Sequence, residues 1–217
     1  MIHTYNEFLT ELDRCGMLLL WSKSEYLSLS QMTPDENWHT GSELDPWLWR
    51  TRLALQRDGA YAHLFRGQGM LISKSFYPVV YAAFHTDMEY EYDSGRITQA
   101  AMRMWELFEE QDTWSRPKLR RAMMREAPEK PTFEAALLTL EANMQITISG
   151  SVQPTSFTGS PVGWQAMDYA RADVWLKDFL PEELPSREEA RQLLLERIHC
   201  NCPAISASGF KKVFGTI

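Results

Sequence analysis

The sequence has few cysteines and no apolar run long enough for a membrane. It holds 3 cysteines in 217 residues, and Cys200 and Cys202 lie closer together than the paired ligands of ordinary zinc sites. Glu7 and Glu11 occupy a region that is positive in a signal peptide. The apolar run Met17–Trp21 is too short to cross a bilayer. We therefore expect a cytoplasmic protein with no membrane segment, no metal site and no cofactor.

Positive charge is also scarce, since 22 Lys and Arg residues stand against 29 Asp and Glu residues. A dedicated nucleic-acid binder is more often basic overall, although a local patch can override the net charge. The sequence has no Walker A run, no Gly-x-Gly-x-x-Gly fingerprint and no His-Glu-x-x-His motif, which removes the usual signals of nucleotide-binding proteins and zinc proteases. With 44% hydrophobic residues, the composition suits one or two globular domains.

What the sequence does contain is an ordered series of short segments between Ile97 and Tyr169. Periodicity, capping residues and turn residues predict a helix, a bridging strand, two more helices and a hairpin. These segments are Ile97–Gln111, Thr113–Pro117 with Ser115 or Thr113 as a cap, Lys118–Arg125, a helix capped by Thr132, and strands at Ile146–Ser149 and Trp164–Tyr169 around the turn-rich Gly150–Gly163. This is the order of a winged helix-turn-helix.

We therefore predict a mainly α protein with a small β component (α+β). The winged helix-turn-helix would occupy residues 96–170, between an N-terminal Trp-rich helical region, 1–95, and a C-terminal helical extension, 171–217. The alternative is that all three pack as one compact unit. The predicted core of the winged helix is Ile97, Ala101, Trp105, Phe108, Leu119, Phe133, Leu137, Leu140, Ile146 and Ile148.

Tryptophans crowd the N-terminal region. The pocket candidates there, which we call the Trp box, are Trp38, His39, Asp45, Trp47, Trp49 and Arg50. Asp45 should cap a helix that begins at Pro46, and Arg50 or Arg52 should make a charged contact with a carboxylate. Trp47 and Trp49 would point about 200° apart on that helix, so both cannot face one core. The rings could stack a flipped base, but the bulk of the indoles favours core packing.

A basic helix is the strongest electrostatic feature. The candidate nucleic-acid-binding residues are Arg116, Lys118, Arg120, Arg121 and Arg125, with help from the hairpin near Gln153–Thr158. These cations could contact phosphates, or they could form a solvated face that offsets neighbouring carboxylates. The next helix, which enters the major groove in DNA-reading winged helices, favours the second interpretation because Glu134 and Glu141 would repel phosphate.

Several motifs together resemble a known family. In chain order they are Trp38-His39-Thr40-Gly41, Asp45-Pro46-Trp47-Leu48-Trp49-Arg50, Tyr77-Pro78, Gly95-Arg96-Ile97, Ile146-Thr147-Ile148-Ser149-Gly150 and Gly163-Trp164. They resemble the small bacterial proteins called AlkZ-related, or YcaQ-like, which are relatives of winged-helix DNA glycosylases that act on alkylated or crosslinked bases. The resemblance implies a winged-helix fold and a connection with nucleic acid. In those glycosylases a Gln-x-Gln motif positions the attacking water, and no Gln-x-Gln occurs here.

Three hypotheses follow. In the first, the chain is a nucleic-acid-associated protein that binds DNA weakly and without sequence preference, and is not itself a working glycosylase. In the second, it is a non-enzymatic interaction module, with a homodimer or another protein as partner. In the third, it is a glycosylase-like hydrolase whose acid or base is Glu36, Asp45 or His39.

Overall fold

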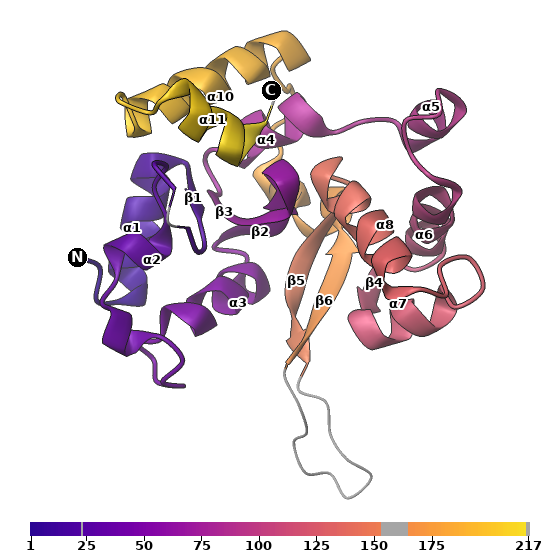
Figure 1. Cartoon of the computed structure of the whole chain (residues 1–217), viewed down its shortest axis with the longest axis horizontal. Helices are drawn as coiled ribbons and strands as arrows, with labels where there is room; N and C mark the ends of the chain where they lie inside the picture. The colour runs from indigo at the N-terminus through magenta and orange to yellow at the C-terminus, as the bar shows by residue number, and fades with distance from the viewer. Residues whose placement is uncertain (23, 153–164, 216–217) are drawn as a thin grey trace, which may run out of the picture. The chain divides into compact units, whose positions relative to one another are not determined.

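The computed structural model describes residues 1–22, 24–152 and 165–215. The chain forms two compact units (Figure 1): unit 1 comprises Met1–His85 and Leu176–Ile217, and unit 2 comprises Thr86–Trp175. Both units mix helices with a small sheet, so the fold is α+β as predicted. The domain division at residues 95 and 170 stays a prediction. Among the described residues, no helix has the length and apolar character needed to cross a membrane.

Unit 1 surrounds an antiparallel sheet of three strands in the order β1-β3-β2, in which Met17 pairs with Ile72 and Gly59 with Ser73. Its elements are α1 (Tyr5–Cys15), β1 (Met17–Leu19), α2 (Leu29–Met32), η1 (Asp35–Asn37), α3 (Pro46–Gln56), β2 (Gly59–Leu64), η2 (Phe65–Gly67), β3 (Gln68–Ser73), α4 (Tyr77–Phe84), η3 (Lys177–Phe179), α10 (Arg187–Asn201) and α11 (Ala207–Phe214).

The turn from α1 into β1 depends on Gly16. Its φ is 76°, a region that favours glycine, and a Cβ there would lie 2.8 Å from Cγ of Phe76. The glycine therefore ends α1 and lets the edge strand of the sheet begin directly against the aromatic ring. The short hydrophobic run Met17–Leu20 that follows is buried, and its first three residues are 0% exposed.

The C-terminal segment belongs to unit 1. Helix α10 begins with a capping box in which Ser186 accepts from the N–H of Glu189, and the Glu189 carboxylate accepts from the N–H of Ser186. It packs along α4, with Ala190 and Leu194 fully buried. Figure 1 shows these helices side by side. Their contact joins distant parts of the chain, since the guanidinium of Arg187 donates to the carbonyl of His85, 102 residues earlier.

Unit 2 contains a second antiparallel sheet of three strands, in the order β4-β6-β5. Its elements are α5 (Met88–Asp93), α6 (Gln99–Glu110), β4 (Thr113–Ser115), α7 (Arg116–Ala122), α8 (Lys130–Ala142), β5 (Ile146–Val152), β6 (Ala166–Arg171) and α9 (Ala172–Trp175). The predicted order of helix, strand, helix, helix and hairpin strands is present. Residues 153–164, which hold most of the expected hairpin tip and the Gly-Trp motif, lie outside the described residues.

Two of the ten predicted core residues are only half-buried. Ile97 lies before α6, because Thr98 caps the helix by accepting from the N–H of Ala101 at 3.2 Å. Trp105 is not enclosed by the core. The guanidinium of Arg171 covers its ring, 5.3 Å from the ring centroid. The remaining eight residues are buried.

The predicted caps of the two following helices also need correction. Thr132 lies inside α8, because Pro131 can occupy the first helical turn and the helix starts earlier, at Lys130. Ser115 holds the N-cap position of α7, but its side chain makes no capping hydrogen bond.

Candidate functional site

The carboxylate of Asp45 organises the Trp box. Its Oδ1 accepts hydrogen bonds from the N–H groups of Trp47, at 2.9 Å, and His39, at 3.1 Å, and its Oδ2 accepts from the N–H of Gly41 at 2.9 Å. The side chain therefore caps α3, as predicted, and also fixes the preceding loop, in which His39 has a φ of 62°. Asp45 is 1% exposed, so these bonds are shielded from water.

A continuous row of aromatic rings runs across this loop. The ring centroids are 4.7 Å apart for Trp21 and Trp38, 6.2 Å for Trp38 and His39, and 5.0 Å for His39 and Trp47. The guanidinium of Arg50 lies 3.7 Å from the centroid of the Trp47 ring. The sequence indicated every member except Trp21, which enters from the end of β1 and gives no local signal of its role.

The two indoles of α3 face different surroundings, as the helical spacing predicted. Trp49 is 1% exposed, stacks on Phe8 with ring centroids 5.8 Å apart, and donates its indole N–H to the carbonyl of Glu43 at 2.8 Å. Trp47 is half-buried. Trp38 is also buried, and its indole N–H finds the Thr33 hydroxyl at 2.9 Å. Packing therefore accounts for Trp49 and Trp38, and a ligand pocket formed by the whole box stays a prediction.

Arg50 and Arg52 differ in environment. Burial lowers the pKa of Arg50, while Tyr61 and the Asp45 carboxylate act in the opposite direction and favour its charged form. The carboxylate expected near Arg50 or Arg52 is therefore that of Asp45, whose negative charge stabilises the charged guanidinium of Arg50. Arg52 is exposed, with its guanidinium 4.0 Å from the centroid of the Tyr5 ring.

The acid and base candidates of the Trp box are poorly arranged for chemistry. The lone pairs of Asp45 are directed at backbone N–H groups, and Glu36 and His39 are exposed. A depression of about 220 Å³ opens beside the box, lined by Thr4, Tyr5, Asn6, Glu43, Leu44 and Arg52, and no box residue lines it. In the described parts of the chain, no group of three or more His, Cys, Asp or Glu residues could hold a metal ion.

In unit 2, two of the five candidate cations serve the fold. Arg116 forms an ion pair with Glu134 of α8, and its other terminal nitrogen donates to the hydroxyl of Tyr169 at 3.4 Å. The guanidinium also lies 6.0 Å from the ring centroid of Phe133. Arg116 therefore links the start of α7 to both α8 and β6.

Arg120 closes the turn between α7 and α8. Its two terminal nitrogens donate to the carbonyls of Ala127, at 2.6 Å, and Pro128, at 2.5 Å. The same guanidinium lies 5.3 Å from the centroid of the Phe133 ring. The sequence could not separate this structural role from phosphate binding, because the carbonyl partners depend on the path of the turn.

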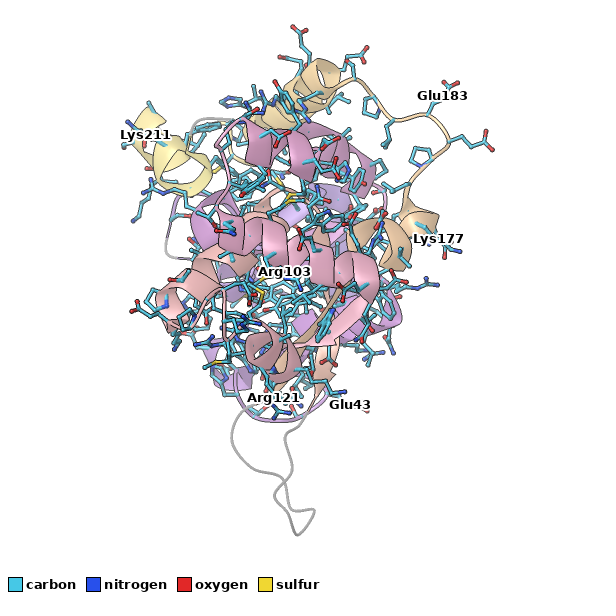
Figure 2. The ribbon with its side chains drawn as sticks, turned by 90° about the vertical axis from the view of Figure 1, so that its right-hand side faces the viewer. Glu43, Arg103, Arg121, Lys177, Glu183 and Lys211 are labelled. Atoms are coloured by element: carbon cyan, nitrogen blue, oxygen red, sulfur yellow. The ribbon has the colours of Figure 1, made fainter. Side chains whose placement is uncertain are left out.

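The remaining three cations, Lys118, Arg121 and Arg125, are exposed. We call them the cation triplet. Figure 2 shows Arg121 at the surface of α7. Within residues 1–22, 24–152 and 165–215, no ion pair or side-chain hydrogen bond engages any of the three. The charge of Lys118 acts through space on the carboxyl of Asp168. Burial raises the pKa of that carboxyl, and the lysine charge works in the opposite direction. The triplet is therefore the part of the basic helix that can meet an external anion.

Helix α8 does not present the acidic surface that the sequence suggested. Glu141 is 0% exposed, and Glu134 is paired with Arg116. The exposed residues along the helix include Ala135, Leu138 and Ala142, which are neutral. The expected repulsion of phosphate by two carboxylates is therefore wrong, because one is buried and the other is neutralised.

Comparison with known proteins identifies a family that matches nearly the whole chain. A family model described as AlkZ related matches residues 2–215, nearly the whole chain. No curated protein and no solved structure matches the chain. The box from Asp45 to Arg50, which carried much of the resemblance seen in the sequence, is the capped start of α3.

Proposed function

Because the chain belongs to the AlkZ-related family, which suggests a protein related to DNA glycosylases, we propose that it associates with nucleic acid and contacts phosphates through unit 2. The observation that carries the proposal is the division of the basic residues. Arg116 and Arg120 are engaged within the fold, whereas the exposed cation triplet presents three charges to solvent. Surface cations of this kind are the usual partners of phosphate groups.

We further propose that unit 2 is a winged helix-turn-helix, with α7 and α8 as the helix pair and β5 and β6 as the wing. The antiparallel pairing of β4 with β6, in which Thr113 lies opposite Ala170, supports this assignment. The indole N–H of Trp114, which donates to the carbonyl of Leu107 at 3.0 Å, also ties β4 to α6. In such folds the second helix of the pair approaches the major groove.

The exposed residues of α8 include Lys130 and Thr132 in its first turn and neutral Ala135, Leu138 and Ala142 further along. Beyond the first turn, these exposed residues have no hydrogen-bonding side chains with which to read base edges. Binding should therefore be weak and largely indifferent to sequence, since phosphate contacts carry no base information. We propose binding without base excision, because the sequence has no Gln-x-Gln and Asp45 is committed to the backbone.

Reversal of charge in the triplet tests the proposal. Arg121→Glu combined with Arg125→Glu should weaken binding to a short fluorescent duplex at least about tenfold at about 50 mM salt, where phosphate contacts are favoured. The measurement is a fluorescence anisotropy titration.

The control is Lys211→Glu combined with Lys212→Glu on α11, which changes the net charge equally and alters exposed residues of unit 1. It should leave the affinity nearly unchanged. Equal losses in the two double variants would show a general effect of net charge and would contradict a phosphate site at α7.

A second candidate function is protein interaction. The neutral, exposed side of α8 favours it, because an uncharged helix face can approach another protein without desolvating a charge. If no DNA or RNA binds at about 50 mM salt, this interpretation replaces the first.

A further inference from the structure

The end of α10 is anchored through Asn201. Its side-chain amide donates to the carbonyl of Cys15 at 2.7 Å and to the hydroxyl of Tyr26 at 3.0 Å. Tyr26 is 0% exposed, and its own hydroxyl donates to the carbonyl of Met17 at 3.3 Å. A single amide thus joins the last turn of α10 to α1 and to the loop after β1.

Glu25 attaches α11 to the same loop. Its carboxylate accepts from the N–H of Ser206 at 2.6 Å and from the Ser206 hydroxyl at 2.7 Å, and these bonds lower the pKa of the carboxyl. A Cβ on Gly209 would lie 2.6 Å from this carboxylate, so glycine leaves the space that the contact needs. Deeper in the contact, the rings of Tyr26 and Phe214 meet edge to face with centroids 4.9 Å apart.

Two thiols flank the anchoring residue Asn201. Cys202 is the C-cap of α10, and its Sγ donates to the backbone carbonyl of Glu25 at 2.8 Å. Cys200 lies in the last turn of α10 and is exposed. The attachment of the C-terminal segment therefore includes one half-buried thiol and has an accessible thiol two residues away.

We propose that Cys200 and Cys202 are a thiol pair whose oxidation to a disulfide releases α11 from residues 24–26. The oxidant is a small-molecule disulfide. The thiolate of Cys200 attacks one of its sulfurs and expels one thiol, which leaves a mixed disulfide on Cys200. The Cys202 thiol then loses its proton and attacks Sγ of Cys200, which expels the second thiol. Two cysteine thiols are oxidised and one external disulfide is reduced to two thiols.

Helix geometry explains why the bond would change the structure. Residues two apart across a helical residue have Cα atoms about 5.4 Å apart, which falls within the range that disulfides span. The two side chains, however, face different surroundings, because Cys200 is exposed whereas Sγ of Cys202 is held at the carbonyl of Glu25. Bringing the two Sγ atoms together therefore requires Asn201 to leave the helical conformation. That movement breaks its bonds to Cys15 and Tyr26, and it takes Sγ of Cys202 from the carbonyl of Glu25.

The test uses the full chain incubated with oxidised glutathione. Intact mass and peptide mapping should show the loss of two hydrogens in the peptide that contains Cys200 and Cys202. Hydrogen exchange of the amides in Ala207–Phe214 should then become at least about tenfold faster than in the reduced protein. Cys15 should stay reduced, because it is buried and burial raises the pKa of its thiol to about 11.

Two variants distinguish the effect of the Cys200–Cys202 disulfide from nonspecific effects of the oxidant. Cys200→Ser should keep the slow exchange of α11 under oxidation. Cys202→Ser retains a hydroxyl that can donate to the carbonyl of Glu25. Hydrogen exchange of α11 should therefore stay slow in this variant, both with and without the oxidant. A mixed disulfide on Cys200 without an internal bond would overturn the proposal. So would an internal disulfide that leaves the exchange of α11 unchanged.

Discussion

Replacing Leu137 by alanine should lower the free energy of unfolding by about 2–5 kcal/mol. Leu137 is 2% exposed and lies on the side of α8 that packs against α6 and β5. The substitution removes buried apolar atoms and leaves a cavity, and both effects weaken the folded state. Urea unfolding, followed by circular dichroism, measures the change.

The neighbouring residue supplies the control. Leu138 is 36% exposed and lies on the same helix, so Leu138→Ala makes the same chemical change on the solvent side. Its cost should stay within about 0.5 kcal/mol. Equal losses for Leu137→Ala and Leu138→Ala would mean that the buried side of α8 is assigned wrongly.

Asp45→Ala should cost about 3 kcal/mol, which is more than a normal helix cap contributes, because a carboxylate that accepts several bonds is lost. Three backbone N–H groups, those of Trp47, His39 and Gly41, lose their acceptor at once. The buried Arg50 also loses the electrostatic support of the carboxylate. The loop of the Trp box should loosen together with the start of α3, and tryptophan fluorescence should report both.

Thr4→Ala is the matched control for Asp45, because it removes a cap from the same unit. The Thr4 hydroxyl accepts only one capping bond, from the N–H of Glu7 at 3.2 Å, at an exposed position. Its loss should cost about 1 kcal/mol or less. A cost for Asp45→Ala no larger than that for Thr4→Ala would show that Asp45 only caps a helix.

Local patterns in the sequence identified the segments that depend on nearby residues. The three- and four-residue steps of apolar side chains located α6 and α8, and Asp45-Pro46 located the start of α3. The predicted helix boundaries were less accurate. The hydroxyl of Thr98, for example, caps α6, so this helix begins after the first residue of its apolar pattern. Periodicity also could not foresee that Trp105 lies beneath a cation.

Contacts between distant residues could not be predicted. Glu25 and Ser206 meet although they are 181 residues apart, and nothing in either local sequence specifies the pairing. The same limit applies to the basic helix. Its composition left phosphate binding and a solvated face both open, and only the path of the chain shows that Arg120 serves a turn and Arg121 does not.

The salt dependence of binding tests the central claim most directly. For the unmodified protein and a short DNA duplex, the logarithm of the association constant should fall linearly with the logarithm of salt concentration. Three phosphate contacts predict a slope of about −2.7, from about 0.9 per contact on duplex DNA. The same slope should be found for unrelated duplex sequences. The absence of binding at about 50 mM salt, or a slope near zero, would contradict phosphate recognition by the cation triplet.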